Sequence, residues 1–225
     1  MTRYTLSYDR LLDKIYGCWL GKSISGTIGA PYEGYKGLLN VQYDPRMIEN
    51  MLPNDDLDLQ ILWLEVVEKN GPGFTSRDLA DAFFHLCPYS PGEYATFRKN
   101  YALGIYPPLS GKFNNNYYIC GMGCPIRSEI WACLAPADPV LAASLSERDG
   151  CLDHDGDSIE AERYIAALEA LAFVWDGSIR DLVEASLAYV DASTRFAGLV
   201  RDVLDWFDAG EGWRQIYGRV LRGYG

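Results

Sequence analysis

Residues 53–69 of the chain read PNDDLDLQILWLEVVEK. Pro53 interrupts the preceding segment, and the stretch from Leu57 to Lys69 then carries apolar side chains on most sides of a helix. A helix that is apolar nearly all round is normally buried in a protein core. The stretch therefore predicts a deeply buried helix that begins close to residue 54.

The polar start of this helix supports two interpretations. Asn54 is a favoured N-cap residue, and Asp55 and Asp56 in the first turn complement the helix dipole. Adjacent carboxylates and an amide, held at a rigid helix start, are also the oxygen ligands that Mg²⁺ and Mn²⁺ prefer. The local sequence leaves capping and metal binding both open.

The rest of the chain is also dominated by helical signals. Apolar spacing and capping residues predict further helices at 9–22, 75–85, 139–149, 159–175, 179–189, 200–207 and 213–221. No alternating strand pattern and no repeat of fixed period appears in the sequence. We therefore predict an all-α fold, a single compact multi-helix domain with long loops. The longest connection, residues 87–128, is rich in Pro, Gly, Asn and Tyr, and a connection of this length is usually functional.

Composition limits the classes of function. The 225 residues carry a net charge of −11, and 48% of them are hydrophobic. An acidic surface disfavours a nucleic-acid partner, because binding requires Lys and Arg to neutralise phosphates. The sequence has neither a signal peptide nor an apolar run of membrane-spanning length, so we expect a soluble, cytoplasmic protein. Six scattered cysteines, in no common zinc spacing, are expected to be free thiols.

Three further clusters carry groups that suit catalysis or binding. They are a glycine-rich segment at 26–34 that includes Glu33, the Gly-Met-Gly segment at 121–123, and an acidic segment at 153–158 that includes His154. A plain helix exit, a flexible turn and ordinary capping are the respective structural alternatives. With two histidines in the chain, a Ser-His-Asp triad is poorly supported. Carboxylate and metal chemistry remains if the protein is an enzyme.

The order of these clusters resembles the ADP-ribosylglycohydrolase family, also called dinitrogenase-reductase-activating glycohydrolase-like, over residues 9–205. The resemblance rests on Pro31 and Glu33, the Asp-Asp pair that opens a buried helix, Gly-Met-Gly with Arg127 downstream, Asp138-Pro139, and an Asp-His pair near residue 153. It implies an all-α fold and a binuclear Mg²⁺ or Mn²⁺ site. It also implies hydrolysis of an N- or O-glycosidic bond at the ribose C1″ of ADP-ribose.

The resemblance also assigns roles to individual residues. It implies metal ligands at Asn54, Asp55 and Asp56, and catalytic roles for Glu33 and Asp55. The substrate-binding residues that it suggests are Gly121, Met122, Gly123, Tyr117, Asp153 and His154. The glycines would approach the diphosphate, and Tyr117 would stack on the adenine. The expected partner is an ADP-ribose-like small molecule or an ADP-ribosylated protein, and neither a nucleic acid nor a membrane.

Three departures from the family pattern bear on activity. Leu57 stands where the family has Thr, and Thr27 stands where it has Asp. The family's second metal motif, Asp-x-Asp-Thr after Gly-Gly, has no counterpart after residue 205. We therefore expect a domain over 1–225 that is incomplete at its C-terminus and a second metal that is half ligated. The alternatives are a catalytically impaired member that binds a nucleotide or has a structural role, a hydrolase of another glycoside, and a helical interaction domain.

Overall fold

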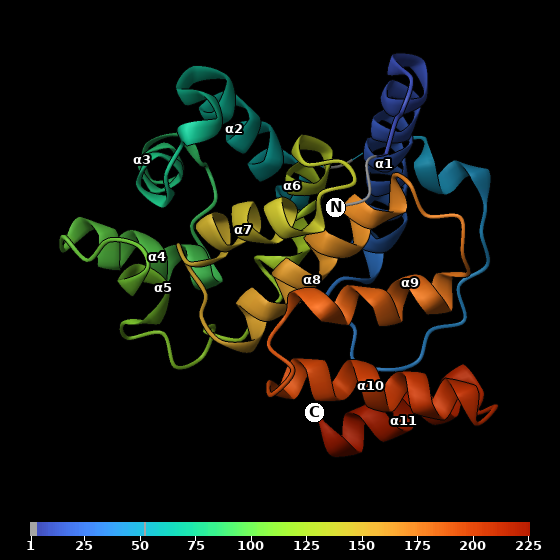
Figure 1. Cartoon of the computed structure of the whole chain (residues 1–225). Helices are drawn as coiled ribbons and strands as arrows, with labels where there is room; N and C mark the ends of the chain where they lie inside the picture. Colours follow the sequence, from blue (N-terminus) through green and yellow to red (C-terminus); the bar gives the residue numbers. More distant parts are fainter. Residues whose placement is uncertain (1–3, 52) are drawn as a thin grey trace.

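The computed structural model describes residues 4–51 and 53–225, and this part of the chain contains eleven α-helices, five short 3₁₀ turns and no strand (Figure 1). The predicted all-α class is confirmed. The helices are α1 (Tyr8–Gly29), α2 (Asp55–Asn70), α3 (Ser76–Leu86), α4 (Gly92–Ala102), α5 (Leu109–Lys112), α6 (Glu129–Leu134), α7 (Pro139–Gly150), α8 (Asp157–Ala172), α9 (Ile179–Ser186), α10 (Arg195–Asp208) and α11 (Trp213–Gly223). None of the described helices is both long enough and apolar enough to cross a membrane.

The core lies between α2, α3, α4, α6, α7 and α8. Trp63 and Phe83 are fully buried there, and the Phe83 ring stacks on Phe97 with centroids 4.8 Å apart. Helices α7 and α8 pack against each other, and a Cβ atom at Gly150 of α7 would collide with the Glu162 side chain of α8. Small residues at a helix contact let the two helix axes approach closely.

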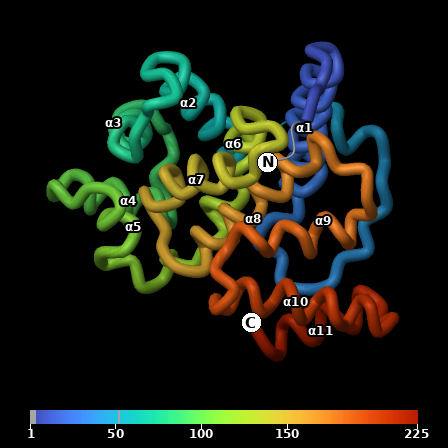
Figure 2. The backbone as a smooth tube through the Cα atoms, viewed as in Figure 1, coloured from blue at the N-terminus to red at the C-terminus, as the bar shows by residue number. Residues whose placement is uncertain are grey.

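The remaining helices flank this core. The tube in Figure 2 places α2 to α5 on one side of α7 and α8, and α9, α10 and α11 on the other. Helix α10 contacts α8, α9 and α11. Within the predicted long connection at 87–128, the structure forms the short helices α4 and α5 and a 3₁₀ turn at Pro125–Arg127.

Helix α1 is longer than the sequence predicted, and this extension helps to form the site. The glycine-rich segment continues the helix as far as Gly29, and the Thr27 hydroxyl donates to the Ser23 carbonyl at 2.7 Å. A Cβ atom at Gly26 would collide with the Asn54 side chain. Glycine therefore allows the end of α1 to lie directly against the start of α2, before a 3₁₀ turn at Ala30–Tyr32 that contains Pro31.

Helix α2 confirms the predicted start but is less buried than expected. Leu57, Leu59 and Trp63 are buried on the face toward the core. Ile61 and Leu64 are 58% and 38% exposed, so the opposite face is open to solvent. The apolar pattern overstated the burial because helices pack against only one face of α2.

Candidate active site

A cleft of about 480 Å³ lies where the end of α1, the starts of α2 and α4, and residues 122–126 meet. This volume is typical of sites that bind small molecules. Its walls are formed by Gly26, Thr27, Gly29, Ala30, Tyr32, Glu33, Pro53, Asn54, Asp55, Asp56, Glu93, Met122, Gly123 and Ile126. The structure thus brings together six of the residues that the sequence singled out: Glu33, Asn54, Asp55, Asp56, Met122 and Gly123.

The start of α2 both caps itself and presents carboxylates to the cleft. Oδ1 of Asn54 accepts a hydrogen bond from the Asp56 backbone N–H at 2.9 Å, as an N-cap does. The Tyr94 hydroxyl donates to Oδ2 of Asp55 at 2.7 Å and fixes that carboxylate. Oδ2 of Asp56 lies 4.0 Å from the Lys22 ammonium. Capping and the presentation of acidic groups are therefore compatible at this helix start.

The cleft holds Asp56 in an unfavourable electrostatic environment. Burial raises the pKa of Asp56 to about 6, Lys22 opposes that rise, and Asp55, Glu129 and Glu33 add to it. Desolvation and neighbouring negative charges both disfavour the ionised carboxylate. Clustered acids with a perturbed pKa in a cleft are typical of functional sites.

The donor chemistry of the cleft suits a hard divalent ion with few protein ligands. Over residues 4–51 and 53–225, no group of three or more His, Cys, Asp and Glu side chains is arranged to hold a metal. Mg²⁺ commonly keeps several waters and uses one or two carboxylates together with its substrate. Asp55 and Asp56 fit that mode, whereas the Asn54 oxygen is already engaged in the cap.

Met122 and Gly123 of the Gly-Met-Gly segment form one wall of the cleft, over a buried histidine. A Cβ atom at Gly123 would collide with the Glu93 carboxylate and lie 2.9 Å from Cε1 of His154. Gly121 lies against the same imidazole, and Met122 between the two glycines is 71% exposed. The glycines are therefore required because the backbone passes so close to the His154 ring.

His154 belongs to a charged network beneath this wall. Arg127 is fully buried and donates to Asp153 at 2.8 and 3.0 Å and to Asp149 at 3.0 and 3.1 Å. Nδ1 of His154 lies 2.6 Å from Oδ1 of Asp153, while Nε2 has no partner among the described residues. Burial disfavours the charged form, yet Arg127 and His154 hold the pKa of Asp153 well below its usual value.

Four predicted substrate-binding residues do not line the cleft. Asp153 and His154 are fully buried behind the glycine segment, so any effect of theirs on a ligand acts through that wall. Gly121 faces an adjoining groove of about 520 Å³ that also shares Met122 with the cleft. Tyr117 is 86% exposed, packs edge-on against Tyr118 and is not among the residues that line the cleft.

Three residues of the site were missed in the sequence. Glu93 lines the cleft, Tyr94 orients Asp55, and Lys22 lies beside Asp56. Glu93 and Tyr94 fall in the long connection that its length had indicated as functional. The sequence around Lys22 does not indicate a role in the site, because its partners Asp56 and Glu129 lie far from it in the chain.

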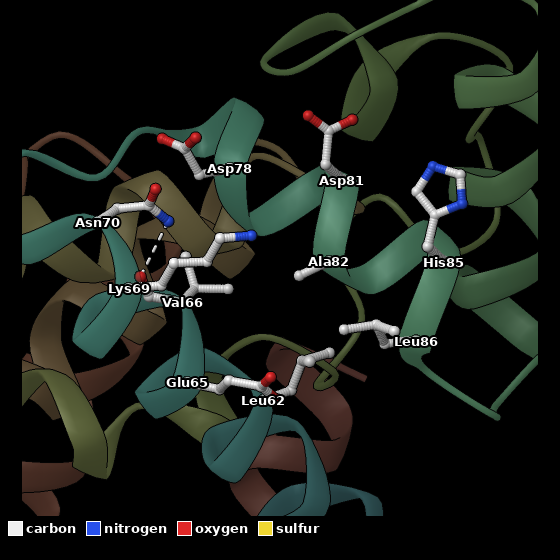
Figure 3. Close-up of a pocket in the computed structure, with 10 residues that line it drawn as sticks. All are labelled: Leu62, Glu65, Val66, Lys69, Asn70, Asp78, Asp81, Ala82, His85 and Leu86. Carbon is white, nitrogen blue, oxygen red and sulfur yellow. Dashed lines mark hydrogen bonds between the residues drawn. The ribbon is translucent and has the colours of Figure 1, made fainter.

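A separate hollow of about 320 Å³ lies between α2 and α3, and its polar groups do not converge (Figure 3). The Asn70 amide donates to the Val66 carbonyl at 2.9 Å. Asp78 is engaged in the capping box of α3, and Asp81 pairs with Arg77. Because these side chains serve local contacts, the hollow is a poorer candidate than the acidic cleft.

Comparison with known proteins identifies the family. No curated protein and no solved structure matches the chain. The family model described as ADP-ribosylglycohydrolase matches residues 7–224, a longer span than the 9–205 expected from the motifs. The chain therefore belongs to the ADP-ribosylglycohydrolase family.

Proposed function

We propose that this chain hydrolyses the glycosidic bond at the ribose C1″ of an ADP-ribosyl conjugate in the cleft formed by α1, α2 and residues 122–126. The observation that carries the proposal is the convergence of Glu33, Asp55 and Asp56 on one cavity beside Gly123. Membership of a family of ADP-ribosylglycohydrolases supports the reaction class. Carboxylates in such an arrangement stabilise the positive charge that develops on the sugar during glycoside cleavage.

Glu33 and Asp55 have different roles in the proposed reaction. Glu33 follows the turn after α1 and lines the cavity, where its carboxylate accepts a proton from the attacking water. The oxygen of that water forms a bond to C1″ as the bond from C1″ to the leaving nitrogen or oxygen breaks. The bonding electrons go to the leaving group, which takes up a proton from solvent water, and Glu33 returns its proton to the solvent. Asp55, held by Tyr94, stabilises the cationic sugar.

Asp55 and Asp56 would hold a divalent ion, Mg²⁺ or Mn²⁺. When bound, the ion supplies a Lewis acid that orients the ribose hydroxyls and acidifies a neighbouring water. Asp56 has to be ionised to serve as a ligand, and its pKa of about 6 makes that ligation weaker in mildly acidic solution. The glycine wall gives a diphosphate close access to the backbone at Gly123.

The test measures release of ADP-ribose from ADP-ribosyl-arginine and ADP-ribosyl-serine peptides with excess Mg²⁺ or Mn²⁺. We expect release by the natural chain, and a loss of about 100-fold or more in Glu33→Gln and Asp55→Asn. Glu68→Gln makes the same kind of change at an exposed position on α2 and should leave release unchanged.

A second candidate is a family member that binds ADP-ribose without cleaving it. The observation that favours it is the absence, among the described residues, of a three-ligand metal group. Binding of ADP-ribose by calorimetry with no release from either peptide would support this candidate and overturn hydrolysis. Absence of both binding and release would contradict both functions.

We also propose a cytoplasmic location. All six cysteines lie in the described part of the chain and are free thiols. Free thiols are typical of reducing compartments.

A further inference from the structure

Lys22 extends from α1 to lie beside Asp56, where its side chain lines the groove that adjoins the acidic cleft. Its side chain is 14% exposed, and its ammonium lies 2.7 Å from Oε1 of Glu129 and 4.0 Å from Oδ2 of Asp56. The same ammonium donates to the carbonyl oxygen of Ile126. Lys22 thus lies between two acids that approach from α2 and α6, with little access to solvent.

Buried hydrogen bonds hold this arrangement in place. Nε2 of Gln60 donates to Oε2 of Glu129 at 2.8 Å and to the Asp56 carbonyl at 2.7 Å. Oε1 of Gln60 accepts from the Ile130 backbone N–H at 2.9 Å. Because Gln60 is 1% exposed, Glu129 and the Lys22 ammonium bound to it are fixed relative to the start of α2.

Lys22 places a positive charge next to a cleft that has only acidic charged side chains in its described lining. Four carboxylates line the cleft, from Glu33, Asp55, Asp56 and Glu93, and no Lys or Arg does so in residues 4–51 and 53–225. An ammonium 4.0 Å from a carboxylate oxygen attracts that oxygen and repels a second cation brought to it. This ammonium therefore occupies the side of Asp56 that faces α1 and α6.

We propose that Lys22 is a built-in cation of the acidic site, which takes the place of one divalent ion and limits the chain to a single Mg²⁺ or Mn²⁺ at Asp55 and Asp56. The inference rests on the proposed function, since it takes this cleft as the cation site. It assigns Lys22 a positioning role that acts through Asp56.

The test is binding of Mn²⁺ to the intact chain, measured by electron paramagnetic resonance of the free ion and by calorimetry. We expect one Mn²⁺ per natural chain, and in Lys22→Met either a second equivalent or binding about tenfold tighter. Lys22→Arg keeps the charge and should bind like the natural chain. Lys14, like Lys22, is a half-buried lysine on α1, and it donates to the Ala172 carbonyl of α8. The Lys14→Met variant should therefore bind Mn²⁺ like the natural chain.

A second pair of variants guards against misfolding. The Lys22→Met change leaves the Glu129 carboxylate without its cationic partner. The comparison is therefore repeated in a Glu129→Gln background, where the single variant Glu129→Gln is compared with the double variant Lys22→Met/Glu129→Gln. The double variant should bind Mn²⁺ more tightly than Glu129→Gln alone. Equal or weaker binding in both comparisons, two ions on the natural chain, or no Mn²⁺ on any protein would overturn the proposal. Failure of the natural chain to release ADP-ribose, with the Mn²⁺ results as expected, would overturn only the proposed hydrolysis.

Discussion

Replacing Asp56 with Asn should stabilise the fold at neutral pH while impairing the site. An unfolded aspartate has a pKa near 3.8, and burial beside other acids raises the pKa of Asp56 to about 6 in the folded state. Between these values the folded chain binds more protons than the unfolded chain, so stability falls as the pH rises. The penalty is absent below about pH 4 and complete above about pH 6.

The size of the effect follows from the same two pKa values. Their difference corresponds to about 3 kcal/mol. The Asp56 side chain is 26% exposed, so solvent screening reduces this figure. The start of α2 also favours a negative charge by up to about 1 kcal/mol, which the variant loses. We expect Asp56→Asn to be more stable than the natural chain by about 1–2 kcal/mol at pH 7.5.

The assay is urea unfolding followed by far-UV circular dichroism in metal-free buffer at pH 7.5 and pH 4.0. The informative quantity is the difference in unfolding free energy between Asp56→Asn and the natural chain, because other titrating groups cancel in it. This difference should be about 1–2 kcal/mol at pH 7.5 and close to zero at pH 4.0. Glu68→Gln, an exposed change on the same helix, provides the control.

The reasoning would be refuted by a difference that stays the same at both pH values. A variant that is less stable than the natural chain at pH 7.5 would refute it equally. Either result would mean that burial does not raise the pKa of Asp56 in the folded chain. The expected combination of higher stability and lower activity is typical of residues kept for function.

Three further changes test other parts of the site. Arg127→Met strands two buried aspartates and should lower the free energy of unfolding by about 3–5 kcal/mol, measured in urea; an unchanged midpoint would contradict the network. Gly123→Ala places a methyl group against the His154 ring and should weaken ADP-ribose binding about tenfold or more by calorimetry, whereas natural affinity would argue against the glycine wall. Tyr94→Phe removes the donor to Asp55 and should destabilise the chain by about 1 kcal/mol in the same urea assay, with no change if that bond contributes nothing.

Helix starts were the most predictable part of this fold. Asn54, Thr75, Asp138 and Ser178 each accept a hydrogen bond from a backbone N–H two or three residues later, at or next to the predicted helix starts. Capping depends on neighbours in the chain, so local sequence is enough to recognise it. The end of α1 was harder, because a glycine inside a helical pattern is compatible both with a helix and with its exit.

The membership of the site was only partly predictable. The resemblance to a family indicated Glu33, Asp55 and Asp56, which the structure brings into one cleft. It also pointed to His154, which the structure buries behind Gly123. A list of polar residues in sequence order does not distinguish a group that faces a cavity from one that supports its wall.

The sequence by itself determined that the chain is helical, where most helices begin, and that two carboxylates stand together at the start of α2. These properties depend on residues within one or two turns of each other. Only the tertiary structure decided that Lys22 and Glu129 lie behind Asp56, that Tyr94 holds Asp55, and that the pKa of Asp56 rises. Contacts between distant segments and the exclusion of water arise only when the helices pack, and they set the charge of this site.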